Sequence, residues 1–198
     1  MSERKHKLPN AALSVRRYRL EDESAFYNAT DANREHMSLL GITAEFPSRK
    51  DATDLFMSNP SRIVDIPTHY GAWIDNTFAG NVFFKLINPE SLPQNLDENI
   101  QKILNTPNTW ELNYWRDKRL PSTPGPAATE NYMDTAIKTA IKMFMESQEN
   151  TANVIAIVEQ SNTPSHRLLH RLGQTALQGL HPHYSAPQLL GSYYLINL

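Results

Sequence analysis

A buried strand followed at once by a short, well-marked helix sets the strongest limit on how this chain can fold. Residues 153–159, NVIAIVE, are a continuous apolar run of strand length, which is typical of a central, buried strand. In the next residues, SNTPSHRLLHRLG, Asn162 or Thr163 can cap a helix, Pro164 suits its first turn and Gly173 can end it. The pair indicates an α/β protein.

The other elements are predicted from the same kinds of pattern. Asp75-Asn76 is a turn pair between two β-rich runs, 69–75 and 77–88, and therefore predicts a hairpin. Further strands are predicted over 13–19, 109–115 (TWELNYW), 175–180 and 191–198. Helices are predicted as two short pieces over 21–40 that part near Thr30, then over 49–59, around 100–104 and from about Ala127 to Ser147.

This order of elements predicts a mixed α/β sheet with helices against it. At 198 residues with 40% hydrophobic content, the chain suits one domain, 1–198, better than two. Residues 1–10 are expected to be a flexible terminus. Residues 88–108 are expected to be a loop or insertion, because the segments on both sides read as parts of one sheet.

Charge and cysteine content exclude several classes of function. The formal net charge is −2, so no overall positive field would draw the chain to nucleic acid or to an anionic membrane. The absence of cysteine excludes disulfides, thiolate metal sites and a cysteine-linked acyl-enzyme. The charged start MSERKHKLPN does not read as a secretory signal, and no apolar run approaches the roughly 18 residues of a membrane span. A soluble, cytoplasmic protein is expected.

A proline-crowded loop joins the strand at 109–115 to the long helix. The order strand, loop, helix N-terminus makes an anion site in many folds, because unpaired backbone N–H groups and the helix dipole point at one place. Pro121, Pro124 and Pro126 contribute no N–H and stiffen the loop. From these residues alone, an anion site and a merely rigid connection remain equally open.

Several motifs together resemble the GNAT superfamily of N-acetyltransferases, and most of all its branch of ribosomal-protein N-terminal acetyltransferases. The resemblance lies in RRYRLEDESAFYNA, NREHMSLL, WELNYW, the loop containing Gly125-Pro126-Ala127, VIAIVEQSN and NTPSHRLLHRLG. It covers nearly the whole chain apart from residues 88–108. It implies a single-domain GNAT-like fold: a twisted, mostly antiparallel mixed sheet flanked by helices.

The resemblance implies a binding site for acetyl-CoA. In the family, loop amides hold the pyrophosphate of the cosubstrate, and here those donors would be the amides of Ser122, Thr123, Gly125, Ala127 and Ala128. Ser122 stands where the family usually has Gln or Arg. Tyr114 and Trp115 at the strand end and Asn162 at the second strand end complete the predicted cofactor contacts. Asn162 also reads as a plain helix cap, and Lys118 and Arg119 could add positive charge.

The implied reaction is direct attack of an amine on the thioester. Glu111 is the candidate base for the acceptor's ammonium, although a strand glutamate that faces solvent or pairs with an arginine is an equal alternative. Leu169 occupies the place of the tyrosine that often protonates the CoA thiolate, which leaves Ser165 as the candidate acid. His166, Arg167, His170 and Arg171 make this helix basic, either as a solvated face or as a phosphate contact.

The predicted partners are acetyl-CoA and an amine acceptor, either a protein N-terminus or a small molecule, with no nucleic acid, membrane or metal, and with the chain a monomer or homodimer. His181 and His183 lack a nearby third ligand and suit a substrate-side loop better than a metal site. A different class of function is a degenerate GNAT-fold module that binds acyl-CoA or a protein partner without catalysis. A phosphate-loop hydrolase is set aside because Gly-Lys-Ser/Thr is missing.

Overall fold

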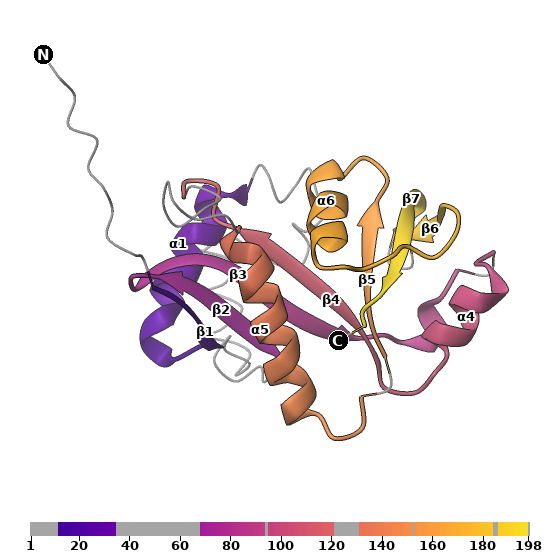
Figure 1. Ribbon diagram of the computed structural model, residues 1–198, viewed down its shortest axis with the longest axis horizontal. Helices are drawn as coiled ribbons and strands as arrows, with labels where there is room; N and C mark the ends of the chain where they lie inside the picture. Colours follow the sequence, from indigo (N-terminus) through magenta and orange to yellow (C-terminus); the bar gives the residue numbers. More distant parts are fainter. Residues whose placement is uncertain are drawn as a thin grey trace, which may run out of the picture. The chain divides into compact units, whose positions relative to one another are not determined.

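The computed structural model describes residues 12–34, 68–93, 95–120, 131–151, 153–183 and 186–197. Across these residues seven strands form one mixed sheet in the order β1-β2-β3-β4-β5-β7-β6, flanked by four α-helices (Figure 1). The mixed, mostly antiparallel sheet confirms the predicted fold class. The strands are β1 (Leu13–Arg17), β2 (His69–Ile74), β3 (Thr77–Leu86), β4 (Thr109–Arg116), β5 (Asn153–Glu159), β6 (His181–His183) and β7 (Ala186–Leu195). The helices are α1 (Glu23–Ala32), α4 (Glu98–Leu104), α5 (Tyr132–Ser147) and α6 (Thr163–Arg171), with short 3-10 turns η1 (Leu20–Asp22) and η4 (Pro89–Ser91).

The chain divides into two compact units. The first comprises Met1–Val82 and Tyr114–Ala140, and the second Phe83–Asn113 and Ile141–Leu198. Strands β3 and β4 and helix α5 each begin in one unit and end in the other. Each unit has its own packed core, and this packing determines which of its polar side chains are buried.

The first unit is built on a hairpin and an aromatic core. Asp75 and Asn76 have φ values of 48° and 67°, as the turn between β2 and β3 requires, so the predicted hairpin is confirmed. β1 pairs antiparallel with β2 from Leu13↔Ile74 to Arg17↔Tyr70. The rings of Trp73 and Phe78 pack edge to face at 5.2 Å between centroids.

The second unit places β5 at its centre, as its apolar sequence predicts. β5 pairs in parallel with β4 and antiparallel with β7, and β6 pairs with the outer side of β7 (Figure 1). Its core joins Ile155 and Tyr193 to Ile100 and Leu104 of α4. The predicted short helix in the 88–108 segment is therefore confirmed, and it contributes to the core of this unit.

Three predicted element positions are wrong. Residues 175–180 form an isolated bridge at Ala176 rather than a strand, and Gly179, at φ 87°, turns the chain before β6. His181–His183, expected in a loop, are β6 itself. Helix α5 starts at Tyr132 and not near Ala127, because Asn131 is non-helical and its side-chain oxygen accepts the amide of Met133 at 3.0 Å.

The helices predicted beyond Arg34 and over 49–59 lie outside the described residues. The break predicted near Thr30 is seen two residues later, where α1 ends at Ala32. Among the described helices, none combines the length and the apolar character needed to cross a membrane.

Candidate functional site

The N-terminus of α6 brings two of the predicted site residues together. Asn162 is the N-cap, and its Oδ1 accepts the amide of Ser165 at 3.3 Å. The Asn162 carbonyl accepts the amides of Ser165 and His166, at 3.1 and 3.2 Å. Asn162 thus caps the helix as predicted, while its Nδ2 group makes no hydrogen bond to the described residues and remains able to donate to a ligand.

His166 links this helix to the sheet, which the sequence did not indicate. Its Nε2 lies 3.1 Å from the carbonyl oxygen of Glu159 at the end of β5, and its Nδ1 lies 2.7 Å from the hydroxyl of Tyr194 on β7. A carbonyl can only accept, so Nε2 carries a proton, and in the neutral ring Nδ1 accepts from Tyr194. Burial raises the pKa of Tyr194, which keeps that hydroxyl a donor.

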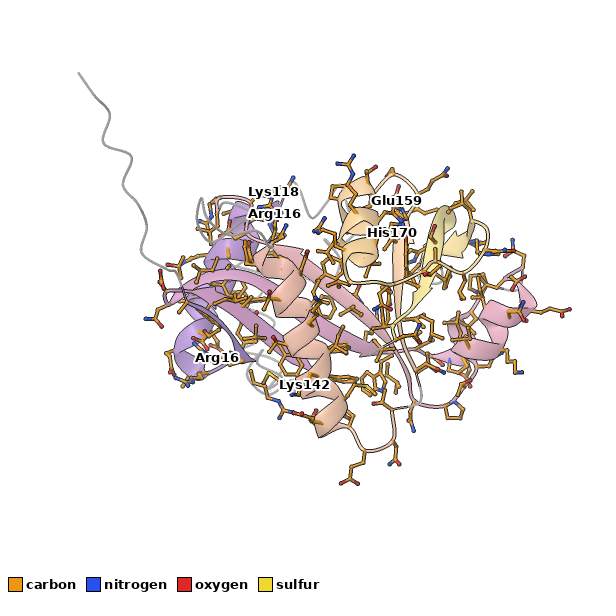
Figure 2. All side chains as sticks on the ribbon, viewed as in Figure 1. Arg16, Arg116, Lys118, Lys142, Glu159 and His170 are labelled. Carbon is orange, nitrogen blue, oxygen red and sulfur yellow. The ribbon has the colours of Figure 1, made fainter. Side chains whose placement is uncertain are left out.

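The basic face of α6 is therefore only partly a solvated face. His166 is half-buried against the sheet, whereas Arg167 and His170 are exposed. Figure 2 places His170 on α6 and Glu159 on the neighbouring β5. Leu169, at the position where the family often has a tyrosine, is 0% exposed and belongs to the core. Ser165 is half-buried and stays the candidate acid of this helix.

Glu111 lies in the parallel pair of strands that leads to this helix. The register runs from Thr109↔Asn153 to Glu111↔Ile155, and from there to Glu159 β5 pairs with β7. Glu111 is 4% exposed, so the alternative of a strand glutamate facing solvent is wrong. Glu111 is the last residue of β4 that pairs with β5, and it stays the candidate base.

Tyr114 and Trp115 belong to the first unit, where β4 ends. The Trp115 side chain is 3% exposed and packs against Phe26 and Phe78, with ring centroids 6.1 and 5.6 Å away. Any contact of Trp115 with a cofactor would therefore come from its backbone. Tyr114 is half-buried.

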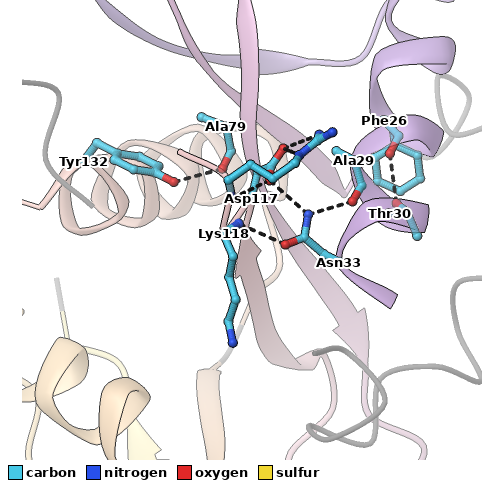
Figure 3. Close-up of polar contacts among 9 residues, drawn as sticks. Phe26, Ala29, Thr30, Asn33, Ala79, Asp117, Lys118 and Tyr132 are labelled. Atoms are coloured by element: carbon cyan, nitrogen blue, oxygen red, sulfur yellow. Dashed lines mark hydrogen bonds and ion pairs between the residues drawn. The ribbon is translucent and has the colours of Figure 1, made fainter. Parts of the chain in front are cut away.

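The cations predicted beside the loop have different roles. Arg119 is bound to Asp117: its Nε lies 2.9 and 3.0 Å from the two carboxylate oxygens. Burial by itself raises the pKa of Asp117, but hydrogen bonds from Arg119 and Asn33 outweigh it, and the pKa lies below its usual 3.8. Lys118, by contrast, has no ion-pair partner among the described residues, and its side chain extends away from this cluster (Figure 3). Arg116 lies beside it at the end of β4 (Figure 2).

The predicted pyrophosphate contacts at Ser122, Thr123, Gly125, Ala127 and Ala128 lie outside the described residues. The residues on either side, up to Leu120 and from Asn131, are described. Within the described ranges no three His, Asp or Glu side chains are grouped so that they could hold a metal ion.

Structural comparison decides the fold family. A GNAT-family acetyltransferase from Bacillus anthracis is 16% identical and superposes with a TM-score of 0.60, over 96% of this chain and 97% of its own. A ribosomal L7/L12 α-N-protein acetyltransferase in complex with coenzyme A is 14% identical, with a TM-score of 0.63 and coverages of 96% and 97%. The fold is that of the GNAT acetyltransferases.

A third similar structure is an acetyltransferase of a small amine. The spermidine N-acetyltransferase from Vibrio cholerae, in complex with CoA and spermine, is 13% identical with a TM-score of 0.59, over 93% of this chain and 94% of its own. By sequence, no family model and no curated protein matches the chain. The resemblance read from short motifs is thus confirmed at the level of fold by structures of very low identity.

Two contacts that shape this GNAT fold could not be predicted from the sequence. Tyr194 and His166 meet through the pairing of β5 with β7, and Asn33 meets Asp117 across 84 residues. No local pattern marks either contact. The pairing of Arg119 with Asp117, only two residues apart, is the one that charge pattern alone could have found.

Proposed function

We propose that this protein is an acetyl-CoA-dependent N-acetyltransferase that moves an acetyl group directly to an amine. The observation that carries the proposal is the GNAT fold over 96% of the chain, shared with a CoA-bound acetyltransferase. Acceptors of two kinds suit it, a protein N-terminus or a small amine, since the similar structures include a ribosomal-protein and a spermidine acetyltransferase. Fold alone does not choose between them.

The residues predicted to contact acetyl-CoA include donors of the kinds that its phosphates and amides accept. The Nδ2 of Asn162, which has no hydrogen-bond partner in the described part of the chain, would donate to an amide carbonyl of the pantetheine arm. Lys118, which has no ion-pair partner among the described residues, and the amides of Ser122, Thr123, Gly125, Ala127 and Ala128 would supply the donors for the phosphates. Backbone groups of Tyr114 and Trp115 belong to the strand that would run beside the thioester.

The proposed reaction forms a C–N bond and breaks a C–S bond. The neutral amine attacks the thioester carbonyl, whose oxygen is polarised by backbone amides of β4. The proton lost by the amine passes to Glu111, directly or through water, and the departing CoA thiolate takes a proton from Ser165. Ser165 then recovers a proton from solvent. Leu169 can supply none, because it is an apolar side chain in the core.

A binding module without catalysis is the second candidate. Its basis is the combination of Leu169 at the usual acid position and three prolines in the presumed phosphate loop. The module would bind acyl-CoA or a protein partner and would show no turnover, and weak or absent CoA binding with an intact fold would favour it.

Isothermal titration with acetyl-CoA tests the first step. The wild type should bind in the micromolar range, Gly125→Trp should abolish binding, and Lys142→Trp should leave it unchanged. Lys142 is a matched control because its side chain, on α5, is 76% exposed (Figure 2). No heat from the wild type, with no shift in melting temperature, would overturn the transferase proposal.

Turnover is then measured by thiol release with a colorimetric thiol reagent. The chain has no cysteine, so the enzyme itself adds no background. Peptides with free N-termini, N-blocked lysine peptides and spermidine serve as acceptors. Acetyl-CoA binding without thiol release across this panel would favour the binding module.

A further inference from the structure

His166, in the first turn of α6, is bonded through both nitrogens of its ring. Its Nε2 donates to the carbonyl oxygen of Glu159 at 3.1 Å, and its Nδ1 lies 2.7 Å from the hydroxyl of Tyr194. Glu159 is the last residue of β5, and Tyr194 is a residue of β7 that is 1% exposed and pairs with Ala156 of β5. Two bonds in different directions restrict rotation of the ring, so this helical turn is fixed to both strands.

The Glu159 carbonyl connects this ring to Asn162. The same oxygen accepts the amide of Asn162 at 2.9 Å and the Nε2–H of His166 at 3.1 Å. The Asn162 carbonyl in turn accepts the amide of His166 at 3.2 Å. The backbone of Asn162 is therefore part of a closed set of hydrogen bonds that includes the His166 side chain.

The side chain of Asn162 depends on this backbone for its direction. Among the described residues its one hydrogen bond comes from the Ser165 amide to Oδ1, at 3.3 Å, and that amide also donates to the Asn162 carbonyl at 3.1 Å. A long bond from a shared donor orients an acceptor only weakly. The direction of the Nδ2 group is thus set by the backbone of Asn162, and through it by Glu159 and His166.

Capping alone does not explain the contact with Tyr194. An asparagine N-cap followed by proline in the first turn starts a helix without any bond from that turn to a neighbouring strand. The bond from Tyr194 adds a fixed orientation of the whole turn relative to β7. A donor that is oriented before its ligand arrives loses less freedom on binding, which increases the affinity.

We propose that His166 and Tyr194 are positioning residues for acetyl-CoA, which act through the Glu159 carbonyl to hold Asn162 so that its Nδ2 donates to an amide carbonyl of the pantetheine arm. This rests on the proposed function, because it takes Asn162 to be a contact of the cosubstrate. Neither His166 nor Tyr194 needs to touch the ligand. All four residues belong to the second unit, so the set of bonds is complete within it.

Two neighbouring tyrosines of β7 form a matched pair for the test. Both are 1% exposed, but Tyr194→Phe removes the bond to His166, whereas Tyr193→Phe removes a bond of 2.7 Å to the Pro182 carbonyl of β6. Both variants should lose similar stability in urea denaturation, because each loses one hydroxyl bond. Titration calorimetry with acetyl-CoA should show about fivefold weaker binding for Tyr194→Phe and less than about a twofold change for Tyr193→Phe. Equal affinities of the two variants would overturn the positioning role and leave the transferase proposal intact.

A double-mutant cycle tests whether the effect passes through Nδ2. Asn162→Asp keeps the acceptor for the Ser165 amide and removes the Nδ2 donor. In that background Tyr194→Phe should no longer weaken acetyl-CoA binding, although it should cost the same stability as in the wild type. A purely structural tyrosine would weaken binding equally in both backgrounds, and that result would overturn the inference, as would wild-type affinity of Asn162→Asp. A wild type that does not bind acetyl-CoA would overturn the proposed function as well.

Discussion

Two connections lead from a strand into a helix in this protein. One is held by contacts between residues close in the sequence, and the other by contacts with distant residues. Residues 160–162 join β5 to α6 through local bonds: the Asn162 cap and the contact from His166 back to Glu159, seven residues earlier. Residues 117–131 join β4 to α5, and their described ends are held by Asn33, 84 residues from Asp117, and by Ala79, 53 residues from Tyr132. A short connection can fix itself, whereas a long one needs distant partners.

The largest effect is expected where the long connection is tied down. Asp117→Ala removes a carboxylate that is 3% exposed together with its bonds to Asn33 and Arg119, and should lower the free energy of unfolding by about 2–3 kcal/mol. Arg119 itself is 56% exposed and can return to water, which limits the loss. Urea denaturation measures this change in the free energy of unfolding. Asp31→Ala, which breaks the exposed pair with Arg34, should cost less than about 0.5 kcal/mol, and equal losses would contradict the comparison.

The second prediction compares Gly80 and Gly173, which require glycine for different reasons. A Cβ at Gly80, next to Ala79, would meet the Trp115 carbonyl oxygen at 2.6 Å, Met133 Sδ at 3.0 Å and Arg116 Cα at 3.2 Å. Gly80→Ala should therefore destabilise the protein by about 1–3 kcal/mol, since β3, β4 and α5 must all move. Gly173, after α6, has open space around it but a φ of 78°, so Gly173→Ala should cost only about 1 kcal/mol. Melting temperatures of the two variants compare the steric clash at Gly80 with the backbone strain at Gly173. A larger loss for Gly173→Ala than for Gly80→Ala would contradict this explanation.

The two connections also show what a sequence can and cannot predict. Asn162, Pro164 and Gly173 marked α6 correctly because capping and termination depend on neighbours in the chain. The hairpin at Asp75-Asn76 and the apolar β5 were predictable for the same reason. The partners of Asp117 and His166 were not, because sheet pairing and helix packing bring them together from distant positions. The predicted strand at 175–180 failed where a partner strand, and not local propensity, determines the pairing.

Acid should weaken the long connection selectively. The pKa of Asp117 is lowered in the fold, where hydrogen bonds from Arg119 and Asn33 outweigh burial, so its stabilisation is complete above the usual pKa of 3.8 and is lost as the pH falls through the lower folded value. The difference in unfolding free energy between wild type and Asp117→Asn should therefore shrink from pH 5 to pH 3. Asp22, whose pKa is also lowered, contributes equally to both proteins and cancels. Urea denaturation of both proteins across this pH range measures the difference. A difference that does not change with pH would contradict a stabilising role for the ionised carboxylate of Asp117.

The smallest stability effect is expected at the short connection, where a single substitution can separate the cap from the cofactor contact. Asn162→Ala removes the acceptor for the Ser165 amide and should cost about 1 kcal/mol at any pH, because no titrating group is lost. Asn162→Asp keeps that acceptor and places a negative charge favourably at a helix N-terminus, so its stability should match the wild type. It loses only the Nδ2 donor. If Asn162 serves solely as a cap, Asn162→Asp will bind acetyl-CoA like the wild type in calorimetry. If Nδ2 donates to the pantetheine arm, the variant will be stable and yet bind about tenfold more weakly.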